Sequence, residues 1–183
     1  MTQKQKTFVV DTSILIREPD IFYKLGQNTI IVPTAVIREL DGLKNNAVAA
    51  TASSARKASR TLDNLGSRQN IASGAKTSVG SVVRICNRYQ TIDGLSSYAD
   101  NKIVGTAVKI NEESETQVIM LTTDANMRNV ARAYGLRAEP YPLLIDDILT
   151  ETVAKSGINY SWNIISALIV AVLALIFVMH YTP

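Results

Sequence analysis

A regular alternation of short apolar runs with longer segments of helical periodicity constrains the fold of this sequence more than any other feature. The apolar runs are TFVV at residues 7–10, TIIV at 29–32, SVVRIC at 81–86, TQVIML at 116–121 and the weaker LRAEPY at 136–141. Each has the length of a strand, and continuous apolar character is typical of a strand buried on both faces. Strands that alternate with helices in this way predict an α/β fold with a central parallel sheet flanked by helices.

Helices are expected between these runs, where apolar side chains recur three or four residues apart. Pro19 and Pro33 should each open a helix, because proline suits the first helical position. The alanine-rich segment after Asn45 should form a surface helix, and another helix should begin near Asp100. The stretch 66–81, GSRQNIASGAKTSVGS, is rich in turn residues and has little to bury, so we expect a mobile loop there.

The distribution of charge divides the chain into two parts that suit different solvents. The net charge is +3, yet every Lys, Arg, Asp and Glu lies at or before Lys155. The run from Trp162 to Met179 is almost entirely apolar, and about 18 residues of helix extend roughly 27 Å, close to the hydrocarbon thickness of a bilayer. The sequence therefore predicts a domain at 1–150, a linker at 151–161 and a single transmembrane helix at 162–180.

The flanks of the apolar run predict its orientation. Tyr160 and Trp162 on one side and Tyr181 on the other are placed as interfacial aromatic residues would be, and Lys155 lies on the domain side. The alternative to a transmembrane helix is a helix buried in the core of a protein. Such helices usually keep a polar stripe, whereas this run is almost entirely apolar. The lone Cys86 and an N-terminus without the pattern of a secretory signal favour a reducing compartment. We therefore expect a membrane protein whose domain is on the cytoplasmic side.

Acidic side chains fall where a parallel sheet gathers its ligands, at the carboxyl ends of strands. Asp11 ends the first run, Asp124 follows the fourth, Asp100 begins a helix, and Glu39 lies on the helix after the second run. Carboxylates gathered at one edge would repel one another unless cations lay among them. Mg²⁺ or Mn²⁺ would suit this site, because hard cations prefer oxygen ligands.

Each acid also has a simpler interpretation when it is taken alone. Asp100 and Asp124 are well placed as helix N-caps, Glu39 as a solvated helix residue, and Asp11 as a turn residue at a strand end. Only their combination favours a site. The only histidine, His180, lies beside the apolar tail, and the chain has no glycine-rich phosphate loop with a lysine, so nucleophilic hydrolysis and nucleotide hydrolysis have little support.

Several spaced motifs together resemble those of a known family. The motifs FVVDTSILI, IIVPTAVIRELDGLK, ARKASRTLDNL, ADNKIVGTAV and MLTTDANMRNVARAYGLRAEPY resemble the successive motifs of PIN domains, in particular the PIN domain at the N-terminus of PhoH-like ATPases. The likeness extends from Thr7 to Tyr141. It implies a PIN-like three-layer fold, and cleavage of single-stranded RNA assisted by Mg²⁺ or Mn²⁺. In this sequence an apolar segment stands where those proteins have an ATPase domain.

The resemblance also assigns roles to residues. Asp11, Glu39, Asp100 and Asp124 match the catalytic and metal-binding acids of the family. Neighbouring polar side chains would orient these carboxylates from a second layer; they are Thr12, Ser13, Asn101, Thr122 and Asn126. The cations expected to hold the RNA backbone are Arg56, Lys57, Arg60, Lys102 and Arg128. Few aromatic residues interleave with these cations in the sequence, so no sequence-reading platform is expected.

Other functions remain open at this point. A PIN fold that binds RNA or a protein partner at the membrane without cutting is one alternative, and a toxin restrained by an antitoxin-like protein is another. The basic residues also have a bland interpretation, as a solvated face that confers solubility. PIN domains commonly pair, so a homodimer is an expectation from the resemblance alone.

Overall fold

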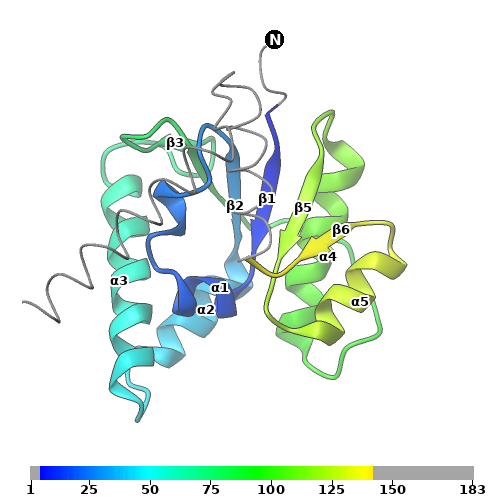
Figure 1. Cartoon of the computed structure of the whole chain (residues 1–183), viewed down its shortest axis with the longest axis horizontal. Coiled ribbons are helices and arrows are strands. Elements are labelled where there is room, and N and C mark those ends of the chain that lie inside the picture. Colours follow the sequence, from blue (N-terminus) through cyan, green and yellow to red (C-terminus); the bar gives the residue numbers. More distant parts are fainter. Residues whose placement is uncertain (1–4, 142–183) are drawn as a thin grey trace, which may run out of the picture. The chain divides into compact units, whose positions relative to one another are not determined.

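The expected strands form one sheet. In the computed structural model, which describes residues 5–141, six strands lie in the order β3-β4-β2-β1-β5-β6 (Figure 1). Their bounds are β1 Thr7–Val10, β2 Thr29–Pro33, β3 Ala75–Lys76, β4 Val82–Cys86, β5 Val118–Leu121 and β6 Arg137–Glu139. All neighbouring pairs are parallel except β3 with β4. The prediction of a mostly parallel central sheet is confirmed.

Helices pack on both sides of the sheet. Their bounds are α1 Thr12–Arg17, α2 Thr34–Leu43, α3 Ala49–Gly66, α4 Tyr98–Glu113 and α5 Ala125–Ala133, with a short 3₁₀ helix at Ile21–Tyr23. Figure 1 shows α3 to the left of the sheet and α4 with α5 to its right. The central strands β1 and β5 are buried along their whole length, as expected for continuous apolar runs.

Helix α3 presents small side chains to its neighbours. Ala52, Ala55 and Ala58 are buried, followed by Leu62 and Leu65 on the same face. Small residues let helices approach closely, and α3 contacts both α1 and α2. The predicted surface helix with one buried stripe is therefore confirmed.

Two local predictions differ from the structure. The helix expected after Pro19 is only the 3₁₀ turn Ile21–Tyr23, since the chain turns at Gly26 with a φ of 62° and enters β2 at Thr29. The stretch 66–81, expected to have little to bury, contains β3, in which Ala75 is fully buried. Pairing with β4 and buried polar contacts hold this stretch, and periodicity over two residues cannot reveal such a short strand.

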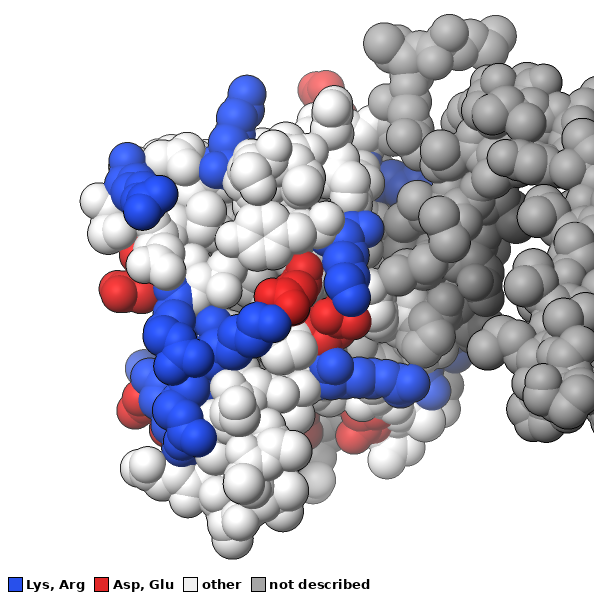
Figure 2. Space-filling view, turned by 60° about the vertical axis from the view of Figure 1, so that its left-hand side comes forward, with Lys and Arg blue, Asp and Glu red and all other residues white. Residues whose placement is uncertain are grey.

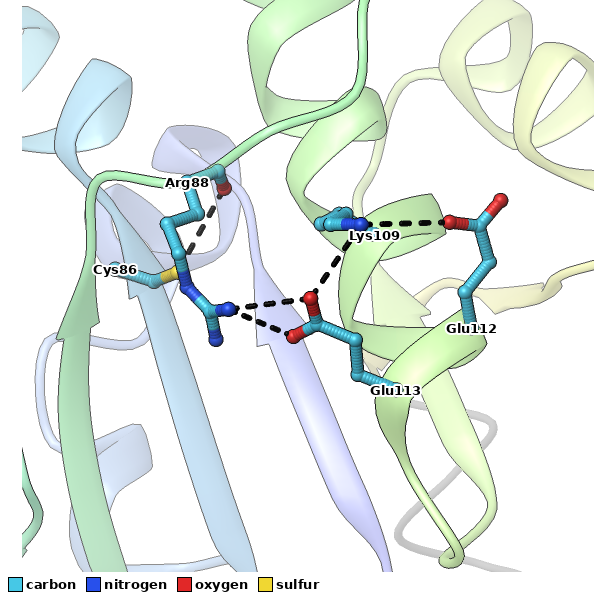
Figure 3. Close-up of polar contacts among 5 residues, drawn as sticks. All are labelled: Cys86, Arg88, Lys109, Glu112 and Glu113. Carbon is cyan, nitrogen blue, oxygen red and sulfur yellow. Dashed lines mark hydrogen bonds and ion pairs between the residues drawn. The ribbon is translucent and has the colours of Figure 1, made fainter.

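The segment between β4 and α4 is fastened along α4. The Gln90 N–H donates to the Gly105 carbonyl at 3.0 Å, and a Cβ on Gly105 would lie 2.1 Å from the Gln90 carbonyl oxygen. Arg88 forms an ion pair with Glu113 at 2.9 Å (Figure 3). With its amide nitrogen turned toward Glu112, the Gln90 side chain donates to both carboxylate oxygens, at 3.0 and 2.7 Å. Gly105 is thus required for a close approach of two backbones.

The predicted linker at 151–161 and transmembrane helix at 162–180 lie outside the described residues, as does the end of the domain predicted at 1–150. Within residues 5–141, the helices are too short or too polar to cross a membrane.

Replacing Gly105 with alanine should destabilise the domain. The added methyl group would force the Gln90 backbone away from α4, and overpacking of this kind costs about 1–3 kcal/mol. Urea titration of the full chain would measure this as a lower free energy of unfolding for Gly105→Ala.

Gly42→Ala is the matched control, because Gly42 lies in α2 and a Cβ at that position would have no neighbouring atom within 4 Å. That substitution should raise stability by up to about 1 kcal/mol through helix propensity. Equal effects of the two substitutions would contradict the close approach at Gly105.

Candidate active site

Asp11 is the most firmly held acid of the candidate site. It follows β1, caps the N-terminus of α1, and is 4% exposed. Its Oδ1 accepts from the Thr12 N–H at 2.6 Å, and its Oδ2 accepts from the hydroxyls of Ser13 at 2.6 Å and Thr122 at 2.8 Å. These donors come from two strand ends, so they fix the direction of the carboxylate.

Thr122 joins the ends of β1 and β5. Its hydroxyl donates to Asp11 and accepts from the Asp124 N–H at 3.0 Å. The Thr123 N–H donates to the Ser13 hydroxyl at 3.1 Å, which adds a second link between the same two ends. Asp124 itself caps α5, where its Oδ1 accepts from the N–H groups of Asn126 at 2.6 Å and Met127 at 3.1 Å. The simpler role of Asp124 as an N-cap is thus present together with a link from its backbone to Asp11 through the Thr122 hydroxyl.

Glu39 faces the same region from α2. The Thr12 hydroxyl donates to the Glu39 carboxylate. Burial raises the pKa of Glu39 above its ordinary value, and the nearby Asp11 and Asp100 carboxylates raise it further, whereas the bond from Thr12 acts in the opposite direction. Glu39 is therefore within electrostatic reach of two other acids of the candidate site.

Asp100 completes this group from the first turn of α4. Burial raises its pKa, and so do the Asp11 and Asp124 carboxylates, while a hydrogen bond with Ser97 acts against them. Asp100 does not cap the helix, because the Ser97 hydroxyl accepts from the Asp100 N–H at 3.3 Å and takes that role. Glu39 is thus within electrostatic reach of Asp11 and Asp100, and Asp100 is within reach of Asp11 and Asp124.

The chemistry of these side chains suits a hard divalent cation, because several carboxylates oppose one another's negative charge. Their geometry as it stands is more open: within the part of the chain that the structure describes, no three or more His, Cys, Asp or Glu side chains gather tightly enough to hold a metal ion. The prediction that Asp11, Glu39, Asp100 and Asp124 share a metal therefore remains a prediction.

The polar residues expected to orient the acids divide into two groups. Thr12, Ser13 and Thr122 donate to the carboxylates of Asp11 or Glu39. Asn101 instead bonds the backbone of Leu95, donating to its carbonyl at 2.8 Å and accepting from its N–H at 3.2 Å, so it holds the loop before α4.

Asn126 contributes its backbone N–H to Asp124. Sequence reasoning missed Ser97, although the pattern Ser-x-x-Asp at 97–100 is a recognised N-cap signal.

The predicted RNA-binding cations lie in different places. On α3, the exposed Arg56 donates to the Lys44 carbonyl and Lys57 forms an ion pair with Asp20, while Arg60 is also exposed. Figure 2 brings forward the side of the molecule on which α3 lies, and there Lys and Arg side chains are grouped around a few carboxylates. These three cations form part of an outer face.

Lys102 and Arg128 are closer to the acids in the chain and in the fold. The Arg128 guanidinium donates to the Thr122 carbonyl at 3.0 Å. The Lys102 ammonium lies over two aromatic rings, 4.8 Å from the centre of the Tyr89 ring and 4.4 Å from that of Tyr98. The spacing of the sequence does not reveal the contact with Tyr89, because folding brings this ring across from Lys102. The expectation that the protein has no sequence-reading platform stays a prediction.

Glu39→Gln should change how stability depends on pH in metal-free buffer. Because the pKa of Glu39 is raised above its ordinary value of 4.5, the folded protein binds this proton more tightly than the unfolded chain does. The stabilisation that this proton gives to the folded protein is complete below the ordinary pKa. It is lost as the pH rises through the raised pKa. The variant, which keeps an acceptor for Thr12, should unfold a few degrees higher than the parent at pH 8 and nearly equally at pH 4.

The measurement is thermal unfolding in EDTA at both pH values. Glu115→Gln provides the control, since this exposed glutamate lies between α4 and β5. If the unfolding temperature of the control at pH 8 rises as much as that of Glu39→Gln, the effect would be due to net charge alone.

Comparisons with known proteins identify the family to which the chain belongs. The chain matches the PIN domain family over residues 8–142. It is 26% identical to Protein PhoH2 of Bacillus subtilis (strain 168) over 85% of this chain and 36% of that protein, and 26% identical to Protein PhoH2 of Thermobispora bispora over 74% and 32%. The chain thus spans about a third of the length of these relatives.

Two solved structures show a looser likeness. One is a domain of a functionally unknown protein from Methanocaldococcus jannaschii, with a TM-score of 0.47 and 24% identity over 74% of this chain and 90% of that one. The other is a PilT N-terminus domain protein from Sulfolobus solfataricus P2, with a TM-score of 0.45 and 14% identity over 78% of this chain and 92% of that one.

The family match that spans residues 8–142 covers most of the described residues. This chain therefore belongs to the PIN domain family, whose fold is generally that of a nuclease.

Proposed function

We propose that this chain is a divalent-metal-dependent endoribonuclease that cleaves single-stranded RNA at the group formed by Asp11, Glu39, Asp100 and Asp124. One observation supports this most directly: the pKa values of Glu39 and Asp100 are raised in part by neighbouring carboxylates. Concentrated negative charge at the carboxyl edge of a sheet is unfavourable for folding and favourable for binding a cation. PIN domains typically use divalent metals.

The residues of this chain would divide the work. Asp11, held in one direction by the Ser13 and Thr122 hydroxyls, is the best oriented candidate ligand. Asp100 and Asp124 would complete the coordination, and Glu39 would contribute directly or through water. A bound Mg²⁺ or Mn²⁺ supplies an activated water and offsets charge on the scissile phosphate.

Arg128 and Lys102, on the helices that follow or carry these acids, would hold the RNA backbone. In-line attack of water on phosphorus would break the bond to the 3′ oxygen, which would leave with a proton from that water. The products would be a 5′-phosphate and a 3′-hydroxyl.

Asp11→Asn should abolish both metal binding and cleavage. Substituting a side chain that orients a metal ligand typically costs 10–100-fold in affinity or activity, so loss of a ligand should cost about 100-fold or more. The assay is cleavage of a fluorescent single-stranded RNA with Mn²⁺, together with the rise in unfolding temperature that Mn²⁺ causes in the parent.

Asp63→Asn is the control, because Asp63 is an exposed residue of α3 outside the group of four acids. It should retain both the cleavage and the stabilisation. Equal cleavage by the parent and Asp11→Asn, or none by either, would remove the enzyme and leave a non-catalytic PIN module that binds RNA or a protein partner.

We also propose that the apolar segment at 162–180 anchors the domain to a membrane from the cytoplasmic side. The support is the sequence: residues 156–183 carry no Lys, Arg, Asp or Glu, and aromatic residues flank the apolar run.

In cell fractionation, the full chain should be found in the membrane pellet and resist extraction with alkaline carbonate. A chain ended after Lys155 should be found in the supernatant. Recovery of the full chain in the supernatant would contradict the anchor and would leave the nuclease proposal untouched.

A further inference from the structure

Two tyrosines and a lysine form a cluster at the start of α4, the helix that carries Asp100. We call it the Tyr–Lys cluster (Tyr89, Tyr98 and Lys102). Lys102 lies one helical turn after Tyr98 on α4, and its ammonium contacts both rings, at 4.4 Å from Tyr98 and 4.8 Å from Tyr89. The Tyr98 side chain is 70% exposed and Tyr89 is 41% exposed. Exposed aromatic rings held against a cation are costly for solubility and typical of binding surfaces.

A polar pocket of about 200 Å³ adjoins the cluster. It is lined by Thr34, Ala35, Arg38, Asn87, Tyr89, Lys102 and Thr106. Two of these are cations and none is acidic, so the pocket suits an anion. Its volume is below the range of about 300–1,000 Å³ usual for small-molecule sites, but it is sufficient for a phosphate group.

The pocket is lined in part by the two helices that carry Glu39 and Asp100. Arg38 immediately precedes Glu39 on α2, and Lys102 follows Asp100 by two residues on α4. These two helices are in contact. A phosphate in the pocket would therefore lie against the two helices that carry Glu39 and Asp100.

The cluster is organised before any ligand binds. Tyr89 lies between two residues that are fastened to α4. Arg88 forms an ion pair with Glu113 (Figure 3), and the Gln90 N–H donates to the Gly105 carbonyl. A rigid segment loses little conformational entropy on binding, which favours affinity.

We propose that the Tyr–Lys cluster and its pocket bind one nucleotide of single-stranded RNA next to the scissile one. Arg38 and Lys102 hold the phosphate, and the unpaired base stacks on the exposed ring of Tyr98. This assignment rests on the proposed function. Stacking on aromatic side chains is the usual way in which unpaired bases are held without sequence preference, and bases within a duplex have no free face for it.

The test is fluorescence anisotropy of the full chain, in mild detergent and EDTA, with a labelled single-stranded RNA of eight nucleotides. EDTA prevents metal-dependent cleavage, so binding is measured independently of catalysis. Tyr98→Ala should weaken binding about tenfold or more, and Tyr98→Phe, which keeps the ring, should bind within about twofold of the parent. Lys102→Gln should lower the slope of log affinity against log salt by about 0.7, whereas Tyr98→Ala should leave it unchanged.

Tyr23→Ala is the matched control, because Tyr23 is 40% exposed in the 3₁₀ helix outside the cluster and should bind RNA like the parent. The same binding measurement is made with duplex RNA and with single-stranded DNA of the same length. Tyr98→Ala should leave duplex binding unchanged, and a preference for DNA over RNA would overturn the assignment to RNA.

Parent-like binding by Tyr98→Ala, or equal losses in Tyr98→Ala and Tyr98→Phe, would overturn the stacking site while leaving the nuclease proposal intact. RNA binding that depends on Tyr98, in a protein that never cleaves RNA, would support the stacking site and overturn the nuclease proposal. No binding by the parent in EDTA would refute the stacking site, and the cleavage assay with Mn²⁺ would decide the nuclease proposal separately.

Discussion

The parallel pairing of β1 with β2 on one side and β5 on the other is the constraint on which the site depends. Val10 lies opposite Leu121, and the Asp11 N–H continues the pairing by donating to the Leu121 carbonyl at 3.0 Å. Asp11 therefore leaves the sheet where Thr122 does, and the two side chains meet although they are 111 residues apart. A slip of one residue in this register would turn the Asp11 side chain to the other face.

The same edge of the sheet carries an electrostatic conflict. Burial is the largest cause of the raised pKa of Glu39 and Asp100, the Asp11 carboxylate raises both values further, and hydrogen bonds with Thr12 and Ser97 act in the opposite direction. Folded proteins tolerate unfavourable electrostatics of this kind mainly where function requires it. A ligand that binds only the folded protein and carries positive charge would relieve the repulsion and stabilise the fold.

The basic residues are also arranged unequally. On α3, Lys57 is engaged by Asp20 and Arg56 by a carbonyl group, so their charges are partly satisfied within the protein. Arg38 and Lys102 instead line a common pocket between α2 and α4 that contains no carboxylate among its lining residues. For the RNA that we propose as ligand, these cations favour a path along the α2–α4 edge over one along the outer face of α3.

The sequence by itself determined the positions of the main strands and helices, and the place of Asp11 at the end of a strand, because buried strands and amphipathic helices have periods that can be read locally. Tertiary structure alone decided the hydroxyl bridge from Thr122 to Asp11, the closeness of Gln90 to Gly105 and the position of Tyr89 beside Lys102. It also decided that Asn101 holds the Leu95 backbone and not a carboxylate. These contacts depend on which side chains packing brings together and on where loops are fastened, and no local periodicity encodes either of them.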